Sequence, residues 1–129
     1  MRRPIVIGGA IIAGYLLGTA GALAGPWEDG MAAYNRGDYL PAIRLFRPLA
    51  EGGNPKAQTV LGVMYRKGEG VARSPIRAFI WFNVAAARGD AKAKAELRDV
   101  SQAMTPQEIS QAREMVQACE ASNYGACEY

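Results

Sequence analysis

Apolar and small residues recur at helical spacing along most of the chain after residue 25. In the stretch 55–67, Ala57, Leu61, Gly62 and Tyr65 stand at positions i, i+4, i+5 and i+8, which places them on one helix face. The same periodicity, bounded by proline, glycine and capping residues, predicts six helices. Their expected ranges are 27–36, 38–51, 55–67, 75–88, 90–104 and 106–120.

The chain also contains an internal repeat. A shift of 36 residues superposes identical residues in neighbouring helical segments. The identical pairs are Ala42 and Ala78, Phe46 and Phe82, Ala50 and Ala86, Gly53 and Gly89, Ala57 and Ala93, and Leu61 and Leu97. A shift of 31 residues superposes Tyr34 on Tyr65, so five additional residues lie within the turn 69–74. Each unit is therefore predicted to be a helix, a turn and a second helix.

The repeats predict how the chain buries its apolar residues. One helix pair could not cover its own apolar face, whereas stacked pairs can. The predicted fold class is therefore all-α, a short α-solenoid of about three antiparallel helix pairs. In the third pair Arg98 replaces Gly62, and Ser101 replaces Tyr65, at the 36-residue shift. Such a polar surface is typical of the terminal cap of a solenoid.

The middle unit carries a more specific motif. It reads Ala57-x3-Leu61-Gly62-x2-Tyr65-x2-Gly68-x-Gly70-Val71, followed by Ala78-x2-Trp81-Phe82-x2-Ala85-Ala86-x2-Gly89. This pattern resembles the Sel-one-like repeat, a branch of the tetratricopeptide-like superfamily. The match covers residues 54–89 nearly throughout, with a shorter unit before it and a degenerate closing unit over 90–120. The resemblance implies an α-solenoid that binds other proteins, often in envelope or stress pathways, and it implies no catalytic residue.

The first 24 residues differ from the rest of the chain. An arginine pair at positions 2 and 3 precedes a long uncharged, apolar stretch that contains the tripeptide Ala22-Leu23-Ala24. This pattern predicts a signal peptide over 1–24 that is cleaved after Ala24, leaving a repeat domain over 25–129 in the periplasm or outside the cell. The alternative is a membrane anchor formed by residues 5–24, because about 20 apolar residues suffice to span a bilayer.

Composition narrows the range of functions. The chain has 15 Lys plus Arg, 12 Asp plus Glu and no His. Without His it lacks the Ser-His-Asp and Cys-His catalytic groups and the HExxH zinc site. Loss of the two N-terminal arginines leaves a net charge near +1, which does not favour binding to nucleic acid. The SxxK motif of penicillin-recognising enzymes is also absent. We therefore predict no catalytic residue, no cofactor and no metal site.

Two cysteines, Cys119 and Cys127, lie close together near the C-terminus. In an exported chain this spacing predicts a disulfide that ties the tail around 122–125 back to the last helix. The alternatives are free thiols in the core, or a redox or metal role, although neither a CxxC motif nor a third metal ligand accompanies them.

The face of the helix 55–67 that lies opposite its packing stripe is the candidate contact surface. A rotation of 100° per residue places Lys56, Thr59, Val63, Arg66 and Lys67 on that face. Cations around an exposed valine would suit an acidic segment of another protein, since solenoids use their concave inner helices for binding. The alternative is an ordinary solvated helix surface.

These observations together predict an exported, non-enzymatic protein-interaction module or adaptor in a bacterial-type cell envelope. The alternative is a cell-wall or β-lactam related enzyme or enzyme regulator. Some cysteine-rich proteins that resemble this family have been associated with β-lactam binding or hydrolysis. The single cysteine pair and the absence of His do not favour catalysis in this chain.

Overall fold

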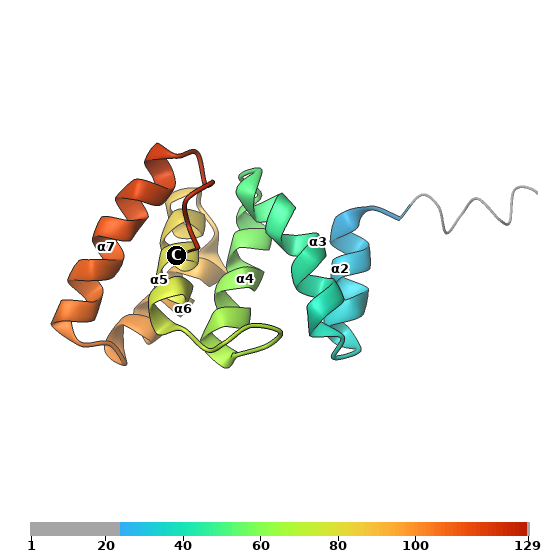
Figure 1. Cartoon of the computed structure of the whole chain (residues 1–129), viewed down its shortest axis with the longest axis horizontal. Coiled ribbons are helices and arrows are strands. Elements are labelled where there is room, and N and C mark those ends of the chain that lie inside the picture. Colours follow the sequence, from blue (N-terminus) through green and yellow to red (C-terminus); the bar gives the residue numbers. More distant parts are fainter. Residues whose placement is uncertain (1–23, 129) are drawn as a thin grey trace, which may run out of the picture.

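The computed structural model of the chain describes residues 24–128, and within them all regular structure is helical. The helices are α2 (Pro26–Asn35), α3 (Tyr39–Glu51), α4 (Pro55–Lys67), α5 (Pro75–Ala87), α6 (Ala91–Gln102) and α7 (Pro106–Ala121). They form a short side-by-side array along the long axis of the molecule (Figure 1). Each helix begins and ends within two residues of its expected range. The all-α solenoid predicted from the sequence is confirmed.

Polar side chains define where the later helices begin. The Asn54 side chain accepts hydrogen bonds from two backbone N–H groups in the first turn of α4. Ser74, Asp90 and Thr105 cap α5, α6 and α7 in the same way. Proline occupies the first position of α4, α5 and α7, where its missing N–H costs no hydrogen bond. The helix boundaries therefore follow from local chemistry.

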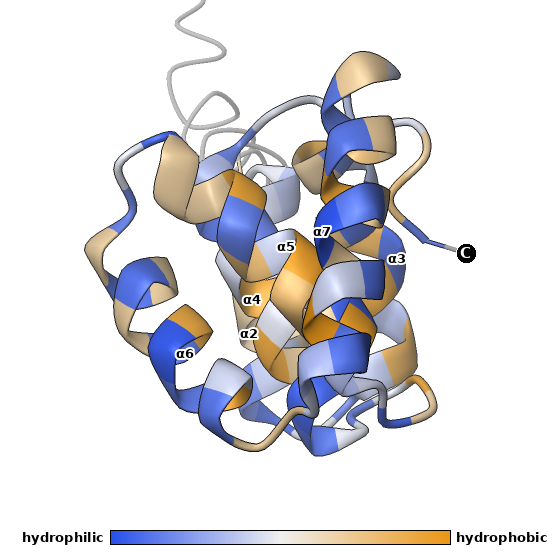
Figure 2. Ribbon diagram, turned by 90° about the vertical axis from the view of Figure 1, so that its left-hand side faces the viewer, coloured by the Kyte–Doolittle hydropathy of each residue, from blue (hydrophilic) through white to orange (hydrophobic). Residues whose placement is uncertain are grey.

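Helix α5 is the centre of the hydrophobic core. It packs most extensively on α4 and also contacts α6 and α7. Trp81 and Phe82 on α5 are fully buried, and they belong to the same cluster as the fully buried Leu61 and Met64 of α4. Viewed along the array, the apolar part of α5 lies between α6 on one side and α7 on the other (Figure 2).

A glycine allows α4 and α5 to approach each other closely. A Cβ atom placed on Gly62 would clash with the ring of Phe82. The aromatic ring therefore rests directly against the backbone of α4. The contact pairs a bulky residue on one helix with a small residue on the other, which lets the two helices pack closely.

The third helix pair differs from the first two. Helix α2 packs extensively on α3, and α4 on α5, but the extensive contacts of α6 and α7 are with α5 rather than with each other. Helix α6 buries Ala93 and Val100, and α7 buries Ala112, Val116 and Cys119. The closing unit is therefore present, but its two helices lie on opposite sides of α5 (Figure 2).

The C-terminal tail folds back over the helix array. The predicted disulfide joins Cys119 of α7 to Cys127. Next to it, a carboxylate oxygen of Glu128 lies 2.9 Å from Nε of Arg47 on α3. The other oxygen accepts a hydrogen bond from Nε1 of Trp81 on α5 at 3.3 Å. The tail thus connects α7, α5 and α3.

The predicted signal peptide over 1–24 lies outside the described residues, except for Ala24. Cleavage after Ala24 and the alternative anchor over 5–24 therefore stay predictions. Among the helices of residues 24–128, none is both long enough and apolar enough to cross a membrane.

Candidate functional site

A hollow of about 290 Å³ lies between α2, α4 and the beginning of α6. We call it the α2–α4 hollow. It is formed by the first helix of each successive pair, which in a solenoid is the inner row. Its lining combines apolar, hydroxyl and charged side chains: Trp27, Met31, Lys56, Thr59, Val60, Asp90 and Lys92.

The floor of the α2–α4 hollow is apolar and held in place from behind. Trp27, Met31 and Val60 are each half-buried and pack against the core. The Trp27 ring lies 5.4 Å from the Phe46 ring of α3, centroid to centroid, in a tilted arrangement. Phe46 itself is fully buried. The Trp27 side chain is thus supported on one side and accessible from the other.

A buried polar contact closes one side of the hollow. The Thr59 hydroxyl lies 2.8 Å from Oδ2 of Asp90 and 2.9 Å from the Pro55 carbonyl oxygen, so its single hydrogen is always used inside the protein. The same Asp90 oxygen accepts a hydrogen bond from the backbone N–H of Ala93 at 2.9 Å. Asp90 is therefore engaged in capping α6 and in joining α6 to α4.

The rim of the hollow is positively charged. Lys56 and Lys92 are both exposed, and they project from the starts of α4 and α6. Asp90 also lines the hollow, but its carboxylate already accepts hydrogen bonds from Thr59 and Ala93. The arrangement offers apolar contact flanked by two ammonium groups, which suits recognition of a segment that carries both apolar and acidic side chains.

The structure corrects part of the contact surface expected on α4. Thr59 is 3% exposed and Val63 is 6% exposed, so the expectation that these two side chains face solvent is wrong. A rotation of 100° per residue from one buried stripe assumes that a helix has a single buried face. Helix α4 instead packs against α3, α5 and α6. Because neighbours cover most of its circumference, a residue opposite the main stripe is also buried.

The charged residues expected on the same surface do not form one site. Lys56 lines the α2–α4 hollow, whereas Lys67 is exposed at the other end of the helix, about 16 Å away at 1.5 Å per residue. Arg66 forms an ion pair with Glu96 of α6, with Nε 3.0 Å from Oε2. Arg66 therefore joins α4 to α6 rather than standing free.

Several lining residues were not found from the sequence. Trp27, Met31 and Val60 were missed because they share the apolar character of core residues, and Lys92 because it resembles other surface lysines of α6. The available signal was the repeat itself, which places α2, α4 and α6 in equivalent positions.

The long turn between α4 and α5 serves as an anchor rather than as a binding loop. The Tyr34 hydroxyl on α2 donates a hydrogen bond of 2.9 Å to Glu69 in this turn. Burial, followed by this hydrogen bond to a carboxylate, raises the pKa of Tyr34 to about 12. The turn thus holds the second unit against the first, which gives the five additional residues a structural role.

Within residues 24–128, no group of three or more His, Cys, Asp or Glu is arranged to hold a metal ion. The same part of the chain matches a known family. Residues 55–90, which comprise α4, the long turn and α5, match the family model of the Sel1 repeat. The chain therefore carries a Sel1 repeat, and the resemblance inferred from its glycines and aromatic pair is confirmed.

Proposed function

We propose that the protein is an exported interaction module that binds an acidic, partly apolar segment of another protein in the α2–α4 hollow. Sel1 repeats generally bind other proteins, which supports the class of function. The observation that carries the specific proposal is the apolar floor around Trp27, flanked by the exposed Lys56 and Lys92.

The two features of the hollow have separate energetic roles. Individual surface ion pairs contribute little, commonly about 0–1 kcal/mol. Burial of apolar surface against Trp27 and Met31 therefore supplies most of the affinity, at roughly 25 cal/mol per Å² of buried area before the costs of association. Lys56 and Lys92 mainly select an acidic partner and speed its approach.

The hollow contains its own spectroscopic probe. The chain has only two tryptophans, and Trp81 is fully buried whereas Trp27 is half-exposed in the hollow. We would titrate the protein with a synthetic peptide of about ten residues in which glutamates surround a Phe-Leu pair. Binding in the hollow should shift the Trp27 emission, and Trp27→Phe should remove this change while leaving a wild-type circular dichroism spectrum.

Charge reversal provides the matched comparison. Lys56→Glu with Lys92→Glu should weaken peptide binding by about tenfold or more. Arg44→Glu with Lys67→Glu changes the net charge equally at exposed positions away from the hollow, and should weaken it by about twofold or less. Equal losses in both variants would mean non-specific attraction and would refute the proposed site.

Export is the second part of the proposal. The arginine pair, the apolar stretch and the Ala22-Leu23-Ala24 tripeptide support it, and so does the disulfide between Cys119 and Cys127. Mass spectrometry of the protein from its native cell should find an N-terminus at Gly25. An intact N-terminus in the membrane fraction would instead support the anchored alternative.

A further inference from the structure

Side chains from three different helices meet one carboxylate of the C-terminal tail. Arg47 of α3 forms an ion pair with Glu128, in which Nε lies 2.9 Å from Oε2. The indole N–H of Trp81 on α5 donates a hydrogen bond of 3.3 Å to Oε1 of the same carboxylate. Burial, followed by the neighbouring charge of Glu128, raises the pKa of the Tyr65 phenol on α4. We call Arg47, Tyr65 and Trp81 the carboxylate site.

The carboxylate site is built into the helix array. Trp81 and Tyr65 are both buried and belong to the hydrophobic core cluster, whereas the Arg47 side chain is partly exposed. Because α4 packs against both α3 and α5, helix packing sets the positions of the three donors. A buried N–H such as that of Trp81 needs an acceptor, and Glu128 supplies it. The site therefore calls for a carboxylate, whichever segment carries it.

The tail occupies this site in the manner of a bound peptide. Residues 122–128 follow α7 without forming a helix. Asn123 and Tyr124 have φ values of +55° and +69°, a left-handed conformation that residues other than glycine seldom adopt. The Tyr124 hydroxyl accepts a hydrogen bond of 2.6 Å from Nη1 of Arg88. Side-chain contacts and the disulfide thus hold the tail in place.

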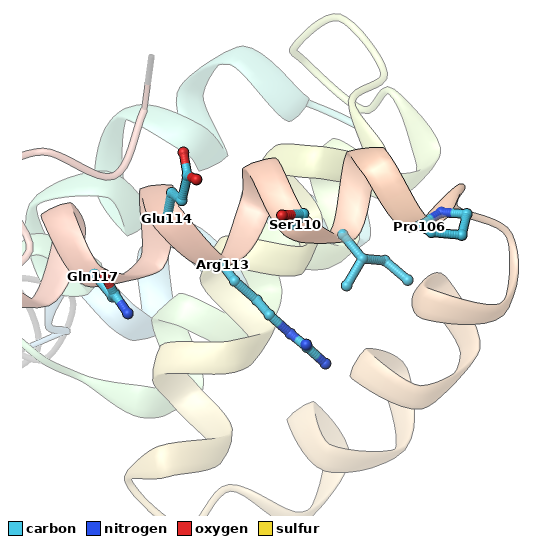
Figure 3. A pocket seen from close by; sticks show the side chains of 6 residues that line it. Pro106, Ser110, Arg113, Glu114 and Gln117 are labelled. Carbon is cyan, nitrogen blue, oxygen red and sulfur yellow. The ribbon is translucent and has the colours of Figure 1, made fainter.

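Helix α7 contributes the anchor of the tail. Its buried face carries Ala112, Val116 and Cys119, and Cys119 forms the disulfide. Its opposite surface carries exposed polar side chains such as Arg113 and Gln117 (Figure 3). The shallow hollow of about 420 Å³ on that surface is lined by α7 alone, so it does not enclose a ligand. The carboxylate site, with donors on three helices, is the better defined of the two.

We propose that the carboxylate site binds an acidic segment of another protein, and that Glu128 fills it from within once the disulfide between Cys119 and Cys127 has formed. The tail itself indicates what such a segment looks like. Gly125 and Ala126 stand shortly before its glutamate, so the fitting ligand is a short extended segment with small residues ahead of a carboxylate. None of the donors lines the α2–α4 hollow, and the two sites are therefore separate.

The disulfide determines which segment occupies the site. When it forms, the two thiols lose two electrons and two protons, and a protein disulfide accepts them and becomes a dithiol. The bond fixes Cys127 beside Glu128 and so raises the effective concentration of this carboxylate at the site above that of a partner in solution. Cys119 and Cys127 are both buried, which shields the closed state from reductants. The thiol form is therefore open to a partner, and the oxidised form is closed.

Trp81 reports directly on the carboxylate site. The chain has two tryptophans, so in a Trp27→Phe background the tryptophan emission belongs to Trp81. The probe is an N-acetylated, C-amidated peptide that copies residues 122–129 with serine in place of the cysteine. The open chain carries Cys119→Ser, Cys127→Ser and Glu128→Gln in this background. The peptide should change its Trp81 emission and bind it at least tenfold more tightly than the oxidised chain that keeps Glu128.

Matched controls separate carboxylate recognition from general attraction. A peptide with glutamine in place of its glutamate should bind the open chain about tenfold more weakly. Arg47→Gln should weaken binding of the original peptide by about tenfold or more. Arg44→Gln makes the same charge change at an exposed position of the same helix and should weaken it by about twofold or less. Equal binding of the two peptides, or equal effects of the two arginine variants, would overturn the proposal.

A second variant keeps the test valid if the serine variant does not fold, which circular dichroism shows. Glu128→Gln with the disulfide intact loses the competing carboxylate and keeps the covalent link. The peptide should bind this chain at least threefold more tightly than the chain that keeps Glu128. No gain in affinity would overturn the proposal.

The remaining occupant to test is the tail of a second copy. The chain with Cys119→Ser and Cys127→Ser should sediment as a monomer at the concentrations used for peptide binding. A dimer that is lost on adding Glu128→Gln would overturn the proposal and assign the site to exchange of tails between copies.

Discussion

In the α4–α5 pair the ring of Phe82 rests on Gly62, whereas in the α6–α7 pair Arg98 stands at the position of Gly62 and both helices pack on α5 rather than on each other. Both pairs begin with capped helices of similar length, so the difference does not arise in the helices themselves. One cause is Arg98, whose long charged side chain takes the place of the glycine that admits Phe82. Helix formation and helix pairing are therefore specified by different residues. A terminal unit can form both of its helices without packing them against each other.

We call α4–α5 the closed pair and α6–α7 the open pair. The largest effect on stability is expected when the closed pair loses an aromatic ring. Phe82→Ala should lower the free energy of unfolding by about 3–5 kcal/mol, because it leaves a cavity against α4. Arg113→Ala at an exposed position of α7 should cost less than about 0.5 kcal/mol. Urea denaturation followed by circular dichroism measures both values. Similar losses in the two variants would contradict the distinction between the pairs.

The disulfide should matter mainly to the open pair. Cys119→Ser with Cys127→Ser should destabilise the chain by about 2.5 kcal/mol, as expected for a loop this short. The effect should be local, since α7 packs on α5 and makes few contacts with α6. Hydrogen exchange should therefore accelerate in α7 and in the tail more than in α4. Uniform acceleration across all helices would show that the two pairs do not differ in this respect.

A third change should bring the open pair closer to the closed one. Arg98→Ala replaces a long charged side chain with a small one at the position that Gly62 holds in α4, so it should raise the free energy of unfolding by about 0.5 kcal/mol. Urea denaturation measures the change. Loss of stability would indicate that Arg98 makes favourable contacts in the folded chain.

The smallest effect concerns the turn that anchors the closed pair. The pKa of Tyr34 is raised to about 12 in the folded chain and is about 10 when unfolded. The folded chain therefore keeps a proton that the unfolded chain releases, and stability falls as the pH rises from 10 to 12. Tyr34→Phe should make this decline shallower in denaturation experiments between pH 8 and 11.5. Glu69→Gln should act in the same direction, because its carboxylate contributes to the shift.

The helix boundaries were predictable because they depend on nearby residues. Asn54, Ser74 and Thr105 cap their helices through backbone groups two or three residues away. The motif also contains both residues of the close contact between α4 and α5, Gly62 and Phe82. Such features need no knowledge of how distant parts of the chain meet.

The candidate site was predicted less well, for a physical reason. The burial of Thr59 and Val63 depends on neighbours on several sides of α4, which a single helical phase does not describe. Arg66 was expected to be free, but its partner Glu96 lies on another helix.

The contact of Glu128 with Arg47 and Trp81 has a consequence for how this chain melts. In a simple solenoid each unit touches its neighbours alone, so unfolding can begin at an end and spread inward by fraying. Here the last residues of the described chain bind a helix of the first unit. Detaching the C-terminal end therefore also loosens α3, and the two ends are thermodynamically coupled. We therefore expect a chain of about three units to unfold in a single cooperative transition, as is usual for a globular domain.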